Sequence, residues 1–313
     1  MAVVIQLVLL AVGFVLLVKG ADWFVEGASK LAEKFGIPQL VIGLTIVAMG
    51  TSLPEAAVSI SAALKGSAEI TIGNIVGSNI LNVLLILGIT SVITPLAVQA
   101  STVKYEMPFV VIVSALLAGI GLTNHVVGRV DGVILWVLMI VYLLYLLRMS
   151  KSGVDIPGEE QGESGDMPVW KTLLLILAGG VMIVAGSDVA VDAATELARI
   201  FGMSERLIGL TIVAFGTSLP ELVTSATAAV KGKADIAVGN IVGSNIFNIL
   251  FVVGTSALIT PVVYNADFLV DSVVCIASSI LLWALVFRKH RLGRAGGACM
   301  LVGYAAYFVY LLR

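Results

Sequence analysis

The chain contains the same sequence motifs twice, separated by a constant offset of 166 residues. Gly50–Glu55 reads Gly-Thr-Ser-Leu-Pro-Glu, and this hexapeptide recurs at Gly216–Glu221. Gly73–Ile80 reads Gly-Asn-Ile-Val-Gly-Ser-Asn-Ile and recurs at Gly239–Ile246. No insertion interrupts the match from residue 20 to residue 95. Repetition at a fixed offset indicates two copies of one structural unit.

The repeat divides the chain into two units, which we place at residues 1–147 and 168–313, with a linker at 148–167 between them. The linker is rich in Gly, Pro, Ser and acidic residues. Its acidic residues do not have the spacing of a calcium-binding loop. We therefore interpret it as a solvated tether.

Composition places both units in a membrane. Hydrophobic residues make up 59% of the chain and charged residues 12%, whereas soluble domains carry about 25% charged residues. The apolar residues form blocks long enough to cross a bilayer, although several are at the short end for a span. We predict an all-α polytopic membrane protein with ten transmembrane helices near residues 3–18, 36–64, 70–95, 106–123, 130–147, 169–186, 205–230, 236–260, 268–287 and 296–312.

Five helices per unit is an odd number, so the second unit must enter the membrane from the opposite side to the first. Two inverted five-helix repeats are typical of alternating-access transporters, which bind their substrate near the bilayer midplane where the repeats meet. The sequence therefore predicts a transport site at the interface between the two units.

The distribution of Lys and Arg predicts the orientation. With the N-terminus outside, only five of the 18 basic residues face outward, and the rest lie in inner loops. The positive-inside rule then favours extracellular or periplasmic termini, a cytoplasmic linker and a location in the cell membrane. The five outward residues are Lys65, Arg129, Arg199, Arg206 and Arg313.

A single carboxylate stands inside each repeated motif. Glu55 is the one charged residue between Lys34 and Lys65, and Glu221 has the same position in the second unit. An ionisable side chain at membrane depth is costly and is by default a candidate functional residue. Each glutamate directly follows a proline that interrupts the helix, and irregular backbone at this depth survives only where it is buried in protein or lines a cavity.

The residues around the glutamates offer further oxygen atoms. Each motif supplies a threonine, a serine and freed backbone carbonyls, and the next helix places a serine and an asparagine four residues apart on one face. Carboxylate, carbonyl, amide and hydroxyl oxygens suit Ca²⁺ and Na⁺ rather than zinc or copper. Two glutamates carry a charge of −2, which one Ca²⁺ or two Na⁺ would balance, so a single pocket would hold either kind of ion but not both.

These paired motifs closely resemble the two alpha repeats of the calcium/cation antiporter superfamily, and the resemblance is nearest to the prokaryotic sodium/calcium exchangers. It covers essentially the whole chain. The resemblance implies Ca²⁺/Na⁺ exchange by alternating access, with Ca²⁺ extrusion that moves net charge. It implies a calcium site formed by Glu55, Glu221 and the carbonyls of Thr51 and Thr217, completed by Asn82 and Asn248. It also implies sodium sites that use Ala48, Ser52 and Ser78 on one side and Ala214, Ser218 and Ser244 on the other.

The expected partners are therefore the two transported ions and the lipid bilayer. We expect no enzymatic activity, no cofactor, no nucleic acid and no obligate protein partner. One position departs from the resemblance, because many relatives carry Asp where this chain has Asn248. An asparagine there argues against potassium dependence and leaves the centre with one acid fewer.

Three alternatives remain at this point. A proton/calcium antiporter of the same fold would require fewer sodium-binding hydroxyl groups than this chain carries. A passive cation channel would require a continuous pore. An intramembrane serine protease would fit the Gly-Thr-Ser-Leu sequence loosely, but it needs a histidine base on a helix. Both histidines, His125 and His290, are predicted to lie in loops, and Cys275 and Cys299 are predicted to pack inside helices.

Overall fold

The computed structural model of the chain describes residues 2–68, 70–151, 167–202, 214–265 and 268–311. Most of the predicted linker, residues 152–166, lies outside the described residues. The same holds for residues 203–213, which include Arg206 and the start of one predicted span, and for Arg313.

The first unit is helical, with several turns of wider π-helix, which are labelled η. Its elements are α1 (Ala2–Phe35), α2 (Gln39–Ile42), η1 (Gly43–Val47), α3 (Ala48–Thr51), α4 (Leu53–Leu64), α5 (Ile70–Leu81), η2 (Asn82–Leu87), α6 (Gly88–Ile93), β1 (Leu96–Ala97), η3 (Thr102–Glu106), α7 (Met107–Asn124), β2 (Val126–Val127) and α8 (Arg129–Lys151).

The second unit repeats most of this order over its described part, but it has no described π-helical turn directly before α15. Its elements are α9 (Val169–Ile200), α11 (Ala214–Gly216), α12 (Leu219–Val230), α13 (Ala234–Phe247), η5 (Asn248–Val253), α14 (Gly254–Ile259), β3 (Val262–Val263), α15 (Phe268–Phe287), β4 (Arg291–Leu292) and α16 (Arg294–Leu311).

Helices α1 and α9 are much longer than the predicted spans of 3–18 and 169–186, so those predicted ends were wrong. Charged side chains end each apolar block, but a charge does not end a helix when its side chain can reach the helix surface. Each helix ends where a glycine adopts a left-handed conformation, at Gly36 with φ of 60° and at Gly202 with φ of 81°.

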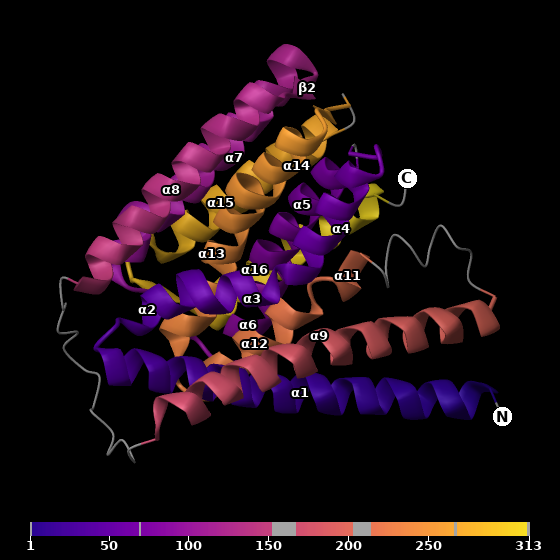
Figure 1. Cartoon of the computed structure of the whole chain (residues 1–313), viewed down its shortest axis with the longest axis vertical. Helices are drawn as coiled ribbons and strands as arrows, with labels where there is room; N and C mark the ends of the chain where they lie inside the picture. The colour runs from indigo at the N-terminus through magenta and orange to yellow at the C-terminus, as the bar shows by residue number, and fades with distance from the viewer. Residues whose placement is uncertain (1, 69, 152–166, 203–213, 266–267, 312–313) are drawn as a thin grey trace.

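The two long helices lie side by side along much of their length (Figure 1). Glycines make this close approach possible. A Cβ atom on Gly20 would lie 2.8 Å from the Gly179 carbonyl oxygen, and one on Gly186 would lie 2.8 Å from the Gly13 carbonyl oxygen. Small residues at a helix interface let backbones approach closely within a membrane, where the hydrophobic effect does not drive helix association.

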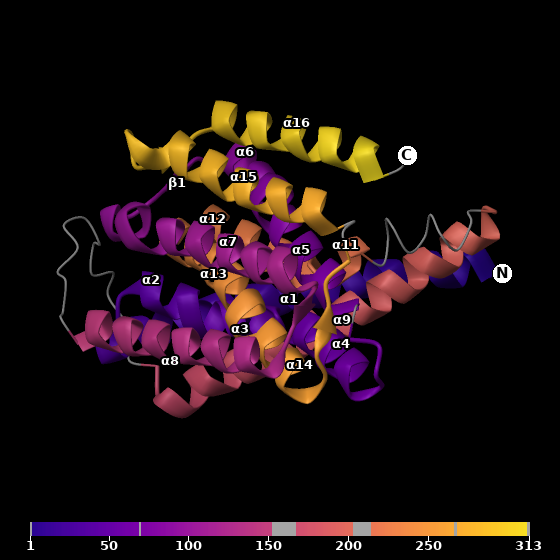
Figure 2. The same cartoon turned by 90° about the horizontal axis from the view of Figure 1, so that it is seen from above.

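The most buried helices lie at the centre of the molecule. Figure 2 shows α5 and α13 in the middle, with α15 and α16 on one side and α8 and α14 on the other. Every described residue of α13 from Ile236 to Phe247 is buried. A Cβ atom on Gly243 would lie 2.7 Å from the Leu44 carbonyl oxygen, so η1 of the first unit packs directly on α13 of the second. The predicted interface between the units is therefore in the core.

Two short antiparallel ladders also join the units. In one, β1 of the first unit pairs with β4 of the second, and in the other β2 of the first unit pairs with β3 of the second. Shifting β1 by the repeat offset gives β3, and shifting β2 in the same way gives β4 to within one residue. Exchange of the two units therefore converts one ladder into the other, which is the behaviour of a two-fold arrangement.

The predicted interruption of the helix at the first motif is confirmed. The helices on either side of Ser52, Gln39–Thr51 and Leu53–Leu64, differ in direction by 50°. Pro54 stands in the first turn of α4, where its missing N–H would have no helical partner in any case. Sequence patterns did not predict the π-helical turns, although η2 and η5 begin at Asn82 and Asn248, and such turns are frequent at functional sites.

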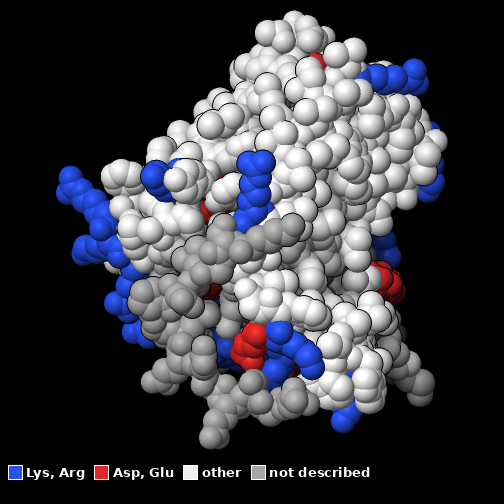
Figure 3. Space-filling view, turned by 60° about the vertical axis from the view of Figure 1, so that its left-hand side comes forward, with Lys and Arg blue, Asp and Glu red and all other residues white. Residues whose placement is uncertain are grey.

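Seven helices of the described chain are long and apolar enough to cross a membrane, and an eighth span results if the bent pair α2–α4 counts as one. Figure 3 shows broad uncharged areas, with Lys and Arg along the left and right edges and a few over the middle. An uncharged surface of this extent is expected where lipid replaces water.

Candidate functional site

The two motif glutamates lie at equivalent places, in the first turns of α4 and α12. Both Glu55 and Glu221 are 0% exposed. Among the described residues neither forms an ion pair with a basic side chain. The partial positive charge of a helix N-terminus favours a carboxylate in this position. A buried and unpaired carboxylate nevertheless remains costly unless a cation joins it.

Hydrogen bonds that cross between the units bring the two glutamates into one site. The Ser52 hydroxyl donates to Glu221 Oε1 at 2.8 Å, and the Ser218 hydroxyl donates to Glu55 Oε1 at 3.2 Å. Each serine stands at the break before one glutamate and binds the other glutamate. The two interrupted helices therefore meet, as the predicted interface site requires.

Four oxygen atoms in this region are buried and have no hydrogen-bond partner. They are Oε2 of Glu55, Oε2 of Glu221, Oδ1 of Asn82 and Oδ1 of Asn248. Each unit contributes one carboxylate and one amide oxygen from matching positions. Buried acceptors almost always have partners, because an unpaired acceptor costs about 1–3 kcal/mol. Oxygen atoms of these two kinds are the ligands that Ca²⁺ takes in proteins.

A frame of amide hydrogen bonds sets the direction of the two free amide oxygens. The Asn82 amide nitrogen donates to Asn245 Oδ1 at 3.0 Å, and that of Asn248 donates to Asn79 Oδ1 at 3.1 Å. Asn79 and Asn245 each donate to the backbone carbonyl of the other, at 3.2 and 3.3 Å. Because this frame holds the amide nitrogens of Asn82 and Asn248, the amide oxygens of these two residues point away from it.

Two further asparagines position the backbone beside each glutamate. The Asn74 amide donates to the Glu55 carbonyl at 3.2 Å and to the Ser59 hydroxyl at 2.9 Å. Asn240 does the same for the Glu221 carbonyl at 3.4 Å and the Ser225 hydroxyl at 2.9 Å. The two units therefore share the same residue types and also the same hydrogen-bond pattern around each glutamate.

Three further candidate residues, Ser244, Thr51 and Ser78, lie beside the glutamates or their hydrogen-bond partners. Ser244 contacts the Ser52 hydroxyl at 2.5 Å, donates to Glu221 Oε1 at 3.3 Å and accepts a bond from the Asn82 amide at 3.3 Å. The Thr51 hydroxyl donates to Asn240 Oδ1 at 3.0 Å, which ties it to the same network. Ser78 is buried beside Glu55.

The other three candidates, Ala48, Thr217 and Ala214, lie just before the breaks in the two interrupted helices. Ala48 is buried, and its methyl group faces Gly243 of α13. Thr217 lies between α11 and α12 and is half-buried. Ala214 begins α11, directly after residues that the structure does not describe.

Sequence reasoning missed several polar residues near the interrupted helices. Ser59 and Ser225 are buried partners of the asparagines that hold the glutamate backbone. Thr90 and Ser256 have buried hydroxyl oxygens without a partner. Both pairs are related by the repeat offset, so a search for hydroxyl residues that recur at this offset could have found them.

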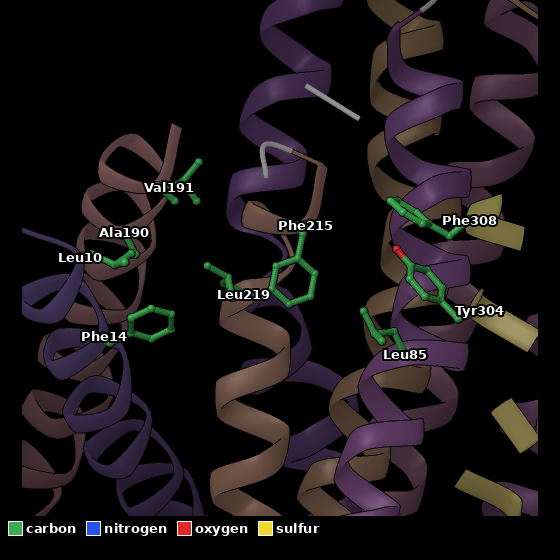
Figure 4. A pocket seen from close by; sticks show the side chains of 10 residues that line it. Leu10, Phe14, Leu85, Ala190, Val191, Phe215, Leu219, Tyr304 and Phe308 are labelled. Atoms are coloured by element: carbon green, nitrogen blue, oxygen red, sulfur yellow. The ribbon is translucent and has the colours of Figure 1, made fainter. Parts of the chain in front are cut away.

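An apolar cavity lies apart from this polar centre. It has a volume of 410 Å³ and lies between the α1–α9 pair and the rest of the bundle. Figure 4 shows apolar side chains around it, including Phe14, Phe215 and Leu219, with the Tyr304 hydroxyl as a polar exception. Such a lining offers almost no cation ligands, so we do not assign the ion site to this cavity.

The fold and the site together define a class of protein. The chain is a helical membrane protein whose two repeated units meet at a buried centre of two carboxylates, amides and hydroxyl groups. Among the described residues no group of three or more His, Cys, Asp or Glu could hold a metal ion. A centre of two acids with neutral oxygens suits ions that must be released again, as in a cation transporter.

Comparison with known proteins identifies the family. The chain belongs to the sodium/calcium exchanger family, whose sequence model, described as "Sodium/calcium exchanger protein", matches residues 5–148 and 171–313. This family consists of ion exchangers and not of enzymes. The chain is therefore a Ca²⁺/cation antiporter of the membrane, and the predicted resemblance is confirmed.

Relatives match over nearly the entire chain. "Inner membrane protein YrbG" of Escherichia coli is 40% identical over 97% of this chain and 95% of that protein. "Sodium/calcium exchanger MaX1" of Methanosarcina acetivorans is 33% identical over 99% of both. A solved structure of the sodium-calcium exchanger NCX_Mj, soaked with zero Na⁺ and Ca²⁺, superposes with a TM-score of 0.85 at 32% identity and covers 99% of each chain.

Proposed function

We propose that this antiporter exchanges Ca²⁺ for Na⁺ by alternating access and extrudes calcium from the cell. The proposal includes ten transmembrane helices, arranged as inverted five-helix units at 1–147 and 168–313 on either side of the linker at 148–167. Matches to sodium/calcium exchangers over the full length support the choice of Ca²⁺ and Na⁺ as the exchanged ions. The relation between the two β ladders supports the inverted repeat.

The four unpartnered oxygens carry the proposal for the calcium site. Ca²⁺ would bind Oε2 of Glu55 and Glu221, with Asn82 and Asn248 supplying amide oxygens from the next helices. The carbonyls of Thr51 and Thr217 would add ligands at the helix breaks. One Ca²⁺ balances the two carboxylates, and this balance matters because an uncompensated charge is expensive in a buried site.

Sodium would occupy positions around the same carboxylates. We assign one set of ligands to Ala48, Ser52 and Ser78 and the other to Ala214, Ser218 and Ser244. The crossed Ser–Glu hydrogen bonds support this assignment, since they place neutral hydroxyl oxygens directly beside each acid. Sodium bound there would share the glutamate oxygens with the calcium site, so the two kinds of ion would exclude each other.

The orientation follows from the charge distribution. We propose that the protein lies in the cell membrane with both termini outside and the linker in the cytoplasm, and that it needs no cofactor. The relative named an inner membrane protein supports the choice of membrane.

Calcium uptake into sealed proteoliposomes tests the exchange. Vesicles loaded with Na⁺ should take up Ca²⁺ when diluted into Na⁺-free buffer, whereas vesicles loaded with K⁺ or acidified inside should not. Uptake driven by the proton gradient alone would favour the proton/calcium alternative. Calcium uptake without any counter-ion gradient would indicate a channel.

A further inference from the structure

A third buried acid, Glu106, lies outside the exchange centre and has no assigned role. Glu106 ends the π-helical turn η3 at the start of α7, within the candidate span Thr102–Asn124. It is 1% exposed, and among the described residues it forms no ion pair with a basic side chain. Its side-chain hydrogen bond goes to α8 and not to the interrupted helices that hold Glu55 and Glu221.

Three oxygen atoms around this acid lack hydrogen-bond partners. The Tyr145 hydroxyl donates to Glu106 Oε1 in a short hydrogen bond, but Glu106 Oε2 has no partner. The Thr102 hydroxyl, one turn earlier in η3, and the Tyr142 hydroxyl, one turn before Tyr145 in α8, are also buried without a partner. Both side chains lie close enough to Glu106 to interact with its carboxyl group.

The corresponding place in the second unit is built differently. After residue 95 the offset shortens to 165 residues, because His125 and Arg129 correspond to His290 and Arg294. Asp271 therefore corresponds to Glu106, and Asp271 Oδ1 accepts a hydrogen bond from the Tyr307 hydroxyl at 2.9 Å. Asp271 is half-buried in the first turn of the regular helix α15, whereas Glu106 is buried at the end of a π-helical turn. A buried acid with an unpaired oxygen therefore occurs together with a widened turn at this place in the first unit.

We propose that Glu106, Thr102 and Tyr142 bind one Na⁺ at a site separate from the exchange centre. A single carboxylate balances one monovalent ion, whereas a divalent ion would leave a buried net charge. A proton on Glu106 would remove the charge, but its single O–H could satisfy only one of the two hydroxyl oxygens. A cation satisfies the carboxylate and both hydroxyls at once, and it requires oxygen ligands of this type.

Thermal unfolding of the purified full-length protein tests this site when the exchange centre has been disabled. In the Glu55→Gln/Glu221→Gln background, replacing choline by Na⁺ at constant ionic strength should raise the unfolding temperature, because a ligand of the native state stabilises it. Adding Glu106→Gln should abolish this Na⁺-dependent shift. Asp271→Asn, the matched change in the second unit, should leave the shift unchanged.

Thr102→Val and Tyr142→Phe provide a second measurement, since they remove ligands but retain the acid. Each should lower the Na⁺ affinity about tenfold in ²²Na⁺ equilibrium binding to the same background, where the parent should bind one ion. A Na⁺ response that survives Glu106→Gln would overturn the proposal. The absence of any Na⁺ response in the background would also overturn it, and would mean that Glu106 is a protonated side chain held by Tyr145.

Discussion

Replacing one glutamate of the exchange centre tests whether the two units share a single calcium site. Glu55→Gln preserves the shape of the side chain, and the amide oxygen can still accept the 3.2 Å hydrogen bond from Ser218. The other carboxylate oxygen, which has no partner, becomes an NH₂ group. The substitution therefore replaces a negative ligand by a donor that points its hydrogens toward the ion.

The size of the effect follows from burial and charge. Glu55 is 0% exposed, so solvent does not screen the change. Removing one partner of a buried charge pair costs about 3–5 kcal/mol. Since each 1.4 kcal/mol is a factor of ten, Ca²⁺ affinity should fall by about two to more than three orders of magnitude.

Calcium binding to the purified protein and ⁴⁵Ca²⁺ uptake into proteoliposomes measure this loss. Glu221→Gln, the matched change in the second unit, should have an effect of similar size. Glu196→Gln removes a carboxylate whose side chain is 46% exposed on α9, and it should leave binding and uptake unchanged. A Glu55→Gln protein that folds and binds Ca²⁺ within threefold of the parent would refute a shared site.

Three other predictions address orientation, coupling and packing. A cysteine at Ser164 in the linker, which lies outside the described residues, should be protected from an impermeant thiol reagent in intact cells; labelling from outside would reverse the topology. If three Na⁺ exchange for one Ca²⁺, each cycle moves one net charge, worth about 2.3 kcal/mol per 100 mV, so an imposed potential should change the rate of sodium-driven uptake. Uptake that is insensitive to potential would indicate two Na⁺ per Ca²⁺. Gly20→Ala places a methyl group 2.8 Å from the Gly179 carbonyl oxygen and should lower the free energy of unfolding by about 1–3 kcal/mol in a denaturant titration. Gly119→Ala, where a Cβ meets no described atom within 4 Å, is the control, and equal losses in the two variants would contradict the packing argument.

The centre of the candidate site was accessible from sequence because it depends on rare residues in a repeated context. Glu55 and Glu221 stand alone in apolar surroundings beside a helix-breaking proline, and the structure buries both and links each to a serine of the other unit. The hydroxyl pair Thr90 and Ser256 was missed, because a threonine or serine inside a helix also occurs commonly for packing.

The third buried acid, Glu106, shows the limit of the same reasoning. Glu106 stands two residues from Lys104, so it resembles part of an ordinary charged helix end. Only the fold reveals that its side chain turns inward, against Tyr145. A sequence records a charge near the end of a span but not the face of the helix that carries it.

Local composition determined the class of the protein. Apolar blocks must be helical in lipid because each backbone group needs a partner within its own segment. Motifs repeated at a fixed offset indicate the same local fold twice. The tertiary structure decided where the helices end and how closely their backbones approach. It also decided which serine donates a hydrogen bond to which glutamate. Gly36 ends α1 through its left-handed conformation, and Ser52 reaches Glu221 across the interface between the units. Both depend on contacts between distant segments, and such contacts exist only after the two units have packed together.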